Sequence, residues 1–310
     1  MRLLAGITDL DRPLTSFLGA NAHAFTRAEL LGPWTRHALD AAVRAGTVAR
    51  VLPGVYCGAA HRDSPSTRGE ALNLWAPRTL VTGALALHLC TPALAAPRVA
   101  DLAARNGDRL HPPAWVRVHQ AGVPLVSSCL GGVNCVTPER ALLDAWRYAP
   151  EHERRNLLWE ALWARACTWR QVERELERAP RVAGRRDLER VLGWFAEGAT
   201  TPLEVLAKHE VFTGARFDAF ERQVDLVLPS RRATVDMLHR RARVVVELDG
   251  DAYHSTRKAR DEDRNRQTDL VAAGYAVVRF GWRDVVDRPE WCRERLLTVV
   301  AGRLTRPGSR

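Results

Sequence analysis

The sequence contains almost no lysine. Lys208 and Lys258 are the only two in 310 residues, although lysine and arginine together number 46. Any chemistry that needs a lysine therefore has two candidates, and the net charge of +10 is carried almost entirely by arginine. Such a surplus is typical of proteins that face phosphate. A genome with a strong GC bias favours arginine codons and gives the same composition, so composition alone leaves both explanations open.

Long apolar runs and paired cysteines are also missing. No uninterrupted run approaches the ~20 residues that span a membrane, and residues 1–14 turn polar too early for a signal peptide. We therefore expect a cytoplasmic protein. None of the six cysteines belongs to a CxxC pair. Scattered cysteines in such a chain are mostly small buried residues, so we expect no zinc site and no disulfide.

The first 65 residues predict a winged helix-turn-helix domain. Thr26 and Glu29 have the spacing of a capping box, which opens a short helix. Residues 35–45 form a second helix, capped by Gly46. A hairpin turning at residues 53–54 completes the outline of helix, turn, helix and wing.

The outward side chains of this domain are candidates for contacts with double-stranded DNA. The second helix leaves Arg36, His37 and Arg44 where a recognition helix meets the major groove, and the hairpin carries Arg50 toward backbone phosphate. The alternative is that these arginines form the solvated face of an amphipathic helix. Winged helices also dock proteins, which leaves a third explanation open.

Between residues 66 and 200 the sequence offers no catalytic constellation. Residues 66–150 predict a mixed α/β region that includes a helix begun by Thr137 and Pro138. His88 and His119 stand in apolar stretches, and we expect both to be packed or hydrogen-bonded rather than ligands. Residues 151–200 read as a charged helical connector.

Residues 201–305 predict a mixed sheet with helices on both faces, which makes the whole chain an α/β protein (α+β overall). Short connections between the first three strands indicate an antiparallel meander, and a crossover helix makes the fourth strand parallel. The expected strands are Gln223–Leu228, Ala233–Leu238, Val244–Leu248 and Tyr275–Phe280, and the expected helices start at Thr201 and cover Ala259–Ala273 and Trp291–Leu304.

Carboxylates stand at the ends of two neighbouring strands of this sheet. Asp236 lies at one strand end, and Glu247 and Asp249 end the next, followed by His254. Glu247 and Asp249 are two residues apart and so share a face of their strand. Buried carboxylates are costly unless a cation or donor meets them. The pattern therefore predicts a site for one hard divalent ion, with His254 beside it.

The same residues resemble a known family. The strand-end Asp236, the ELDG run at 247–250, His254, the D-x-x-R-x-x-x-L helix at 263–270 and the G-Y-x-V-x-R strand at 274–279 are similar to the restriction-endonuclease-like domain related to very-short-patch-repair endonucleases, within the PD-(D/E)xK superfamily. The resemblance covers roughly residues 201–304 and implies a magnesium- or manganese-dependent DNA endonuclease.

The resemblance implies a metal-dependent nuclease site made of the following residues. Asp236 and Glu247 stand as the two metal-binding carboxylates, and Asp249 occupies the position that is usually lysine. The repair-endonuclease branch lacks that lysine too and uses histidine, which His254 supplies. Glu204 corresponds to an acidic residue on the first helix, and Gln223 corresponds to a polar residue on the first strand. We expect Glu204 to complete the metal's oxygen ligands or to bind a ligating water, and His254 or Gln223 to align the attacking water.

Simpler explanations exist for each of these residues. Asp249 with Gly250 is common turn chemistry, and Glu247 could pair with a buried arginine such as Arg279. Arg266 stands three residues after Asp263, a spacing typical of an intrahelical ion pair. Contact between Arg266 and DNA phosphate is the second explanation for that residue.

The N-terminal region resembles abortive-infection type IV antitoxins, through the GVY run at 54–56 and the VTPERALLD run at 136–144. Two functions follow. One is a DNA endonuclease delivered by the winged helix, in phage defence or DNA repair. The other is a non-catalytic, antitoxin-like transcriptional regulator that keeps the nuclease fold for binding DNA or a partner, such as a toxin or another defence-system protein.

Overall fold

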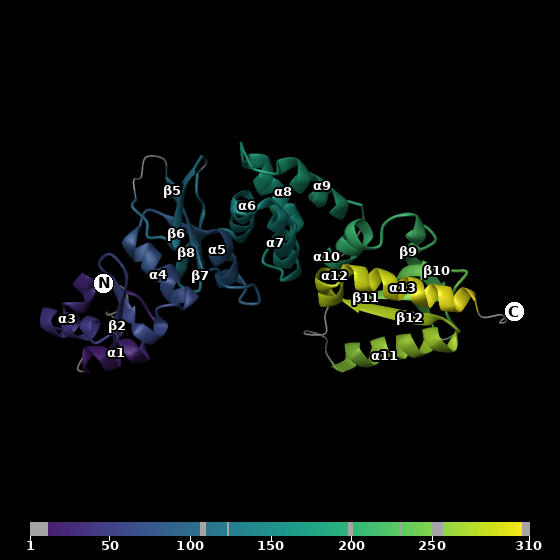
Figure 1. Ribbon diagram of the computed structural model, residues 1–310, viewed down its shortest axis with the longest axis horizontal. Helices are drawn as coiled ribbons and strands as arrows, with labels where there is room; N and C mark the ends of the chain where they lie inside the picture. Colours follow the sequence, from purple (N-terminus) through teal and green to yellow (C-terminus); the bar gives the residue numbers. More distant parts are fainter. Residues whose placement is uncertain are drawn as a thin grey trace. The chain divides into compact units, whose positions relative to one another are not determined.

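The chain divides into two compact units, Met1–Glu189 and Arg190–Arg310 (Figure 1). The computed structural model describes residues 12–105, 110–122, 124–197, 201–229, 231–249 and 257–305, and for the helix that starts at Arg257 it describes side chains from Arg264 onward. Both units combine helices with β-sheets, so the expected α/β class is confirmed. The finer division of the chain into four parts stays a prediction.

The N-terminal unit begins with short helices and a small antiparallel sheet of order β1-β3-β2. The expected capping box is confirmed, because Thr26 Oγ1 accepts from the Glu29 amide at 3.2 Å and the Glu29 carboxylate accepts from the Thr26 amide at 2.8 Å. Phe17, Leu30 and Leu39 are fully buried beneath these elements. The elements are α1 (Leu14–Ala20), β1 (Phe25–Thr26), α2 (Arg27–Leu30), α3 (Arg36–Arg44), β2 (Val48–Leu52) and β3 (Val55–Gly58).

A second, five-stranded sheet follows, with the order β6-β5-β4-β8-β7 and both parallel and antiparallel pairs. Helix α4 packs against β2 and β3 of the first sheet and also against β4 and β8 of the second, so one helix joins the two sheets. The elements are α4 (Pro65–Trp75), β4 (Leu80–Thr82), α5 (Gly83–Cys90), β5 (Ala100–Arg105), β6 (Val116–Ala121), β7 (Ser127–Leu130), β8 (Val133–Val136), α6 (Pro138–Tyr148), α7 (Glu151–Trp163), α8 (Trp169–Arg178) and α9 (Arg185–Phe195).

His88 and His119 are both hydrogen-bonded, as predicted. His88 Nδ1 lies 2.8 Å from the Leu94 carbonyl oxygen. His119 Nε2 lies 2.7 Å from Oδ1 of the buried Asp101, and its ring stacks on Tyr148 at 3.4 Å between centroids. Packing and hydrogen bonding therefore account for both side chains.

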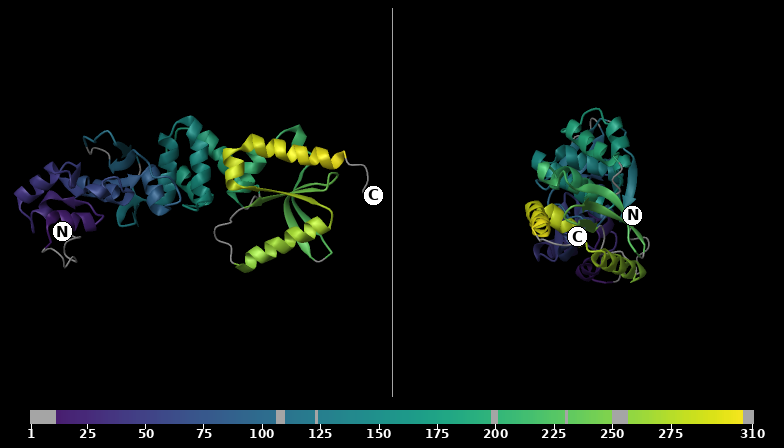
Figure 2. Two further views of the ribbon diagram at one scale, coloured as in Figure 1. Left: turned by 60° about the horizontal axis from the view of Figure 1, so that its bottom comes forward. Right: turned by 90° about the vertical axis from the view of Figure 1, so that its right-hand side faces the viewer.

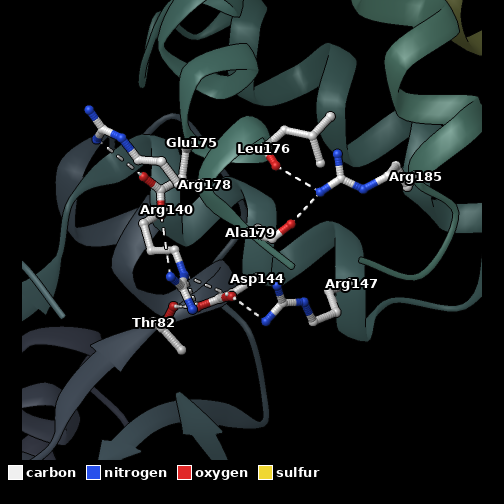
Figure 3. A network of polar contacts seen from close by, with 9 residues as sticks. All are labelled: Thr82, Arg140, Asp144, Arg147, Glu175, Leu176, Arg178, Ala179 and Arg185. Atoms are coloured by element: carbon white, nitrogen blue, oxygen red, sulfur yellow. Dashed lines mark hydrogen bonds and ion pairs between the residues drawn. The ribbon is translucent and has the colours of Figure 1, made fainter. Parts of the chain in front are cut away.

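Helix α6 carries a buried polar network (Figure 3). The Asp144 side chain is 1% exposed and accepts from Thr82 Oγ1 at 2.8 Å and from Arg140 Nε at 3.0 Å, and its Oδ1 lies 3.4 Å from an Arg147 nitrogen. The second partner of Arg140 is Glu175 on α8, at 3.3 Å. Helix α6 is therefore linked to strand β4 and to helix α8 by buried polar and charged side chains.

The C-terminal unit has the predicted sheet, in the order β12-β11-β10-β9. Strands β9, β10 and β11 are antiparallel neighbours, and β12 runs parallel to β11. Helices α11 and α13 lie on opposite faces of this sheet (Figure 2). The elements are α10 (Pro202–Leu206), a π-helical turn (Ala207–Val211), β9 (Glu221–Val227), β10 (Arg232–His239), β11 (Val244–Asp249), α11 (Arg257–Ala272), β12 (Ala276–Gly281), α12 (Trp282–Asp287) and α13 (Pro289–Leu304).

The six cysteines are free thiols. Burial raises the pKa of Cys57 to about 11 and that of Cys135 to about 12, as expected for thiols packed as small apolar groups. In the part of the chain that the structure describes, no helix is both long and apolar enough to cross a membrane.

The network around Asp144 predicts that removing this buried charge destabilises the fold more than removing an exposed carboxylate. Asp144→Asn should lower the free energy of unfolding of the N-terminal unit by about 3–5 kcal/mol, because it leaves buried Arg140 without its main counter-charge. Asp40→Asn is the matched control, since Asp40 meets Arg36 at 3.5 Å on the surface and such pairs contribute about 0–1 kcal/mol. Urea unfolding followed by circular dichroism measures both. Equal losses in the two variants would contradict a structural role for the network.

Candidate functional site

Three consecutive elements bring Glu204, Gln223 and Asp236 together. Thr201 caps α10 by accepting from the Glu204 amide at 3.2 Å, which places Glu204 in the first turn of the helix. Gln223 on β9 donates from Nε2 to Glu204 Oε2 at 3.2 Å and to Asp236 Oδ1 on β10, also at 3.2 Å. A single amide nitrogen therefore bridges two carboxylates from a helix and a neighbouring strand.

The backbone of Gln223 is strained. Its φ is +49°, in the left-handed region that costs a residue with a side chain about 1 kcal/mol or more. The β9–β10 ladder is regular on either side, with Val235 opposite Val224 and Met237 opposite Arg222. Such strain persists only where surrounding contacts hold it, and it concentrates at functional sites. The strain therefore supports a functional role for the amide that reaches Glu204 and Asp236.

Asp236 is fixed to the next strand as well. Its Oδ2 accepts a 2.6 Å hydrogen bond from the Leu248 amide on β11. Burial raises the pKa of Asp236, and the negative charge of Glu204 raises it further, while the hydrogen bonds from Leu248 and Gln223 and the charge of Arg266 oppose the shift. Asp236 therefore accepts hydrogen bonds from two donors, but burial still disfavours its ionised form.

Glu247 has an arginine partner. The side chain is buried, and its Oε2 lies 3.1 Å from a terminal nitrogen of Arg266 on α11. The same guanidinium donates to the Thr234 carbonyl on β10 at 3.2 Å. Arg266, predicted as a DNA contact, therefore lies against the sheet in this arrangement. Its expected intrahelical partner, Asp263, has a side chain outside the described residues.

Asp249 is paired in a similar way. Arg279 on β12 lies 2.9 Å from Asp249 Oδ2, and its Nη1 donates to Gln267 Oε1 on α11 at 3.4 Å. The parallel register places Arg279 beside Glu247 and Gly281 beside Asp249. From the sequence, an ion pair between Glu247 and a buried arginine such as Arg279 was an alternative to a metal site. The observed partner is Arg266, and Arg279 pairs with the other carboxylate.

Two of the four predicted metal ligands are brought together. Glu204 and Asp236 suit a hard divalent cation, because a cation would relieve the repulsion that raises the Asp236 pKa. Glu247 and Asp249 would have to exchange their arginines to join them. Across the described side chains, no three His, Cys, Asp or Glu groups lie close enough together to hold a metal ion. His254, the predicted catalytic histidine, lies outside the described residues.

The predicted DNA-contacting residues of the N-terminal unit are exposed. Arg36 and His37 stand at the start of α3, and Arg44 ends it. Arg36 Nε lies 3.5 Å from Asp40, and Arg44 Nε donates to the Asp40 carbonyl at 3.3 Å. Arg50 is exposed on β2. The buried side of α3 consists of Leu39 and Ala42.

Residues 204–300 match the family model described as REase_MTES_1575. The C-terminal domain is restriction-endonuclease-like. The match contains Glu204, Gln223, Asp236, Glu247 and Asp249, and it confirms a restriction-endonuclease-like domain in this part of the chain. The relation to very-short-patch-repair endonucleases stays a prediction. The resemblance of the N-terminal region to antitoxin winged helices stays a prediction.

Two further comparisons concern the whole chain. No curated protein matches the sequence. The crystal structure of the Rv2827c protein from Mycobacterium tuberculosis is similar to this chain at 14% sequence identity and a TM-score of 0.42, over 70% of this chain and 88% of that one.

The raised pKa of Asp236 predicts a pH-dependent effect of Asp236→Asn in metal-free buffer. A carboxyl group whose pKa rises on folding stabilises the fold fully below its unfolded pKa, near 4, and this stabilisation is lost as pH rises through the folded value. The variant mimics the protonated form and should therefore unfold at a higher temperature than wild type at pH 7. Its advantage should disappear near pH 4.

Asp225→Asn is the matched control for this effect. Asp225 is exposed on β9 of the same sheet and accepts a 2.6 Å hydrogen bond from Thr234 Oγ1. This variant should show no gain at pH 7. A wild-type protein that is more stable than Asp236→Asn at pH 7 would contradict the raised pKa.

Proposed function

We propose that this chain is a magnesium- or manganese-dependent DNA endonuclease, in which the N-terminal helix-turn-helix region binds double-stranded DNA and the restriction-endonuclease-like domain hydrolyses a phosphodiester. The observation that carries the proposal is the amide bridge from Gln223 to Glu204 and Asp236. It lies within the residues that match the family model, and it joins the three polar positions that the resemblance identifies on the first helix and the first two strands.

The metal would be held by Asp236 and Glu204, with Glu247 and Asp249 as further predicted ligands. When bound, a divalent cation lowers the pKa of a coordinated water and polarises a phosphoryl oxygen. The Leu248 amide fixes the orientation of Asp236 through Oδ2, which leaves Oδ1 to Gln223. Both amide hydrogens of Gln223 point to the two carboxylates and keep them at one place, and its amide oxygen is an acceptor for a hydrogen of the attacking water. His254 is the proposed base.

The proposed DNA contacts are Arg36, His37, Arg44 and Arg50. All four are exposed, and the net charge of +10 favours association with a polyanion. A role in phage defence or DNA repair belongs to this proposal.

A second candidate function is supported by the arginine pairs. Glu247 and Asp249 are both charge-compensated by Arg266 and Arg279, an arrangement that is stable without a metal. A domain of this kind serves equally well as a scaffold that binds DNA or a toxin-like partner protein. In that case the chain is a non-catalytic, antitoxin-like regulator.

Cleavage of supercoiled plasmid in the presence of Mg²⁺ or Mn²⁺ separates the two functions. Asp236→Asn should reduce the rate at least about 100-fold, the loss typical when a positioned catalytic group is removed. Because this substitution is expected to stabilise the fold at pH 7, its loss of activity cannot be attributed to unfolding. Asp225→Asn should cleave like the wild type.

Two outcomes of the plasmid assay would count against the nuclease. Equal cleavage by wild type and Asp236→Asn would assign the activity to another site or to a contaminant. A wild-type protein that binds duplex DNA but does not cleave it with either metal would favour the regulator.

Binding to a short duplex tests the DNA interface separately. Arg36→Gln combined with Arg44→Gln should weaken binding and reduce the slope of log affinity against log salt by about 0.9 for each phosphate that the variant no longer neutralises. Arg181→Gln combined with Arg186→Gln removes the same charge from exposed positions in the same unit and serves as the control. Fluorescence anisotropy at several salt concentrations measures both. Identical slopes for the two double variants would contradict the assignment of α3 to DNA.

A further inference from the structure

The N-terminal unit contains a hollow of about 420 Å³ beside helix α4. One side is formed by strand β2 and the turn after β3, and the other by the loop after α5 and the residue that precedes β6. This volume lies within the range of small-ligand sites, about 300–1,000 Å³. The lining residues are Val51, Arg62, Asp63, Arg68, Ala96, Pro97, Arg98 and Trp115.

One wall of this hollow is rigid. The guanidinium of Arg68 lies 4.6 Å from the centre of the Trp115 ring and donates to the carbonyl oxygens of Pro97, at 2.9 Å, and Arg98, at 2.6 Å. Arg68 thereby clamps the loop after α5 onto α4, and stacking on the indole adds about 1 kcal/mol. The shape of the hollow is therefore set before any ligand arrives.

Two further arginines line this hollow. Arg62 and Arg98 are both exposed, and among the described residues neither guanidinium lies in an ion pair with a carboxylate. The one acidic lining residue, Asp63, acts on Arg68, whose pKa is lowered by burial and supported by that charge. Arg62 and Arg98 line the hollow together with the apolar indole ring of Trp115. Their charges give the hollow a positive electrostatic potential.

We propose that this hollow binds a phosphate group of a nucleic acid or nucleotide, with Arg62 and Arg98 as the ligands of the phosphate oxygens. Arginine suits this role because its planar donors match two phosphate oxygens at once. Backbone phosphate of duplex DNA is the source that we favour, and that choice rests on the DNA-binding function proposed above. Val51, which lines the hollow, follows Arg50 on β2, so the hollow begins one residue along the chain from a proposed DNA contact.

Binding by the full-length double variant Arg62→Gln, Arg98→Gln tests the proposal. The control is again Arg181→Gln, Arg186→Gln, which removes equal charge from the same unit. Both pairs are exposed, and unchanged thermal unfolding midpoints would show that each variant folds. One arm measures affinity for a short DNA duplex at several salt concentrations by anisotropy, and the other measures binding of a free deoxynucleoside monophosphate by calorimetry.

In the duplex arm, the salt slope of the hollow variant should fall by about 0.9 for one phosphate, and its affinity at low salt should fall at least about tenfold, while the control keeps the wild-type slope. Binding of the free nucleotide to wild type, and its absence only in the hollow variant, would identify a nucleotide site instead and still support phosphate recognition. A hollow variant that equals the control in both arms overturns the proposal.

The two arms also separate this proposal from the proposed function. If the wild type binds no duplex, the DNA-binding function fails, and the nucleotide arm alone then decides whether the hollow recognises phosphate. If the wild type binds duplex and only the α3 variant is impaired, the function stands and the hollow does not contribute to it.

Discussion

A carboxylate that leaves water must be met by hydrogen-bond donors, and this constraint governs both units of the chain. Asp144 is met by Arg140, Arg147 and Thr82. In the C-terminal unit, Asp236 is met by amides and Glu247 by Arg266. Because the chain has two lysines and many arginines, the buried charges are met by planar guanidinium groups. A guanidinium can reach two elements at once, as Arg266 does with Glu247 and Thr234.

The same constraint divides the candidate site into two parts with different chemistry. Glu247 and Asp249 are neutralised by arginines, whereas Glu204 and Asp236 share one uncharged amide and repel each other. A cation would relieve the repulsion within the second pair. For the proposed nuclease, Glu204 and Asp236 are therefore the pair at which we expect a divalent ion to bind first. Glu247 and Asp249 would have to leave their arginines to become further ligands.

The arginines of the N-terminal unit differ in burial and in the groups that they contact. Arg140 is buried and paired, so its charge is used within the fold. Arg68 also makes its contacts within the fold, with two carbonyl oxygens and with the indole ring of Trp115. Arg62 and Arg98, which line the same hollow, are exposed. A basic composition therefore does not identify which arginines are available to a ligand until the contacts of each guanidinium are known.

Local sequence determined the elements and the order of the C-terminal sheet. The β-branched run at Val244–Val246 and the short connections on either side predicted a buried strand within an antiparallel meander, and both are present. The parallel β12 followed from the crossover helix. In the N-terminal unit, Thr26 and Glu29 predicted their capping box because that motif acts over three residues. The proximity of Asp236 to Gln223 and Glu204 followed from the resemblance to a family.

Tertiary structure alone decided which charges meet. Thr137 and Pro138 indicated the start of α6, but the sequence did not reveal that Arg140 and Asp144 are buried together, because their other partners, Thr82 and Glu175, are distant in sequence. The choice of Arg266 rather than Arg279 for Glu247 depends on how α11 packs across the sheet. The hollow at Trp115 joins segments some 60 residues apart. Side-chain pairing of this kind depends on packing between distant elements, whereas helices and strands form from local backbone preferences and the spacing of apolar residues.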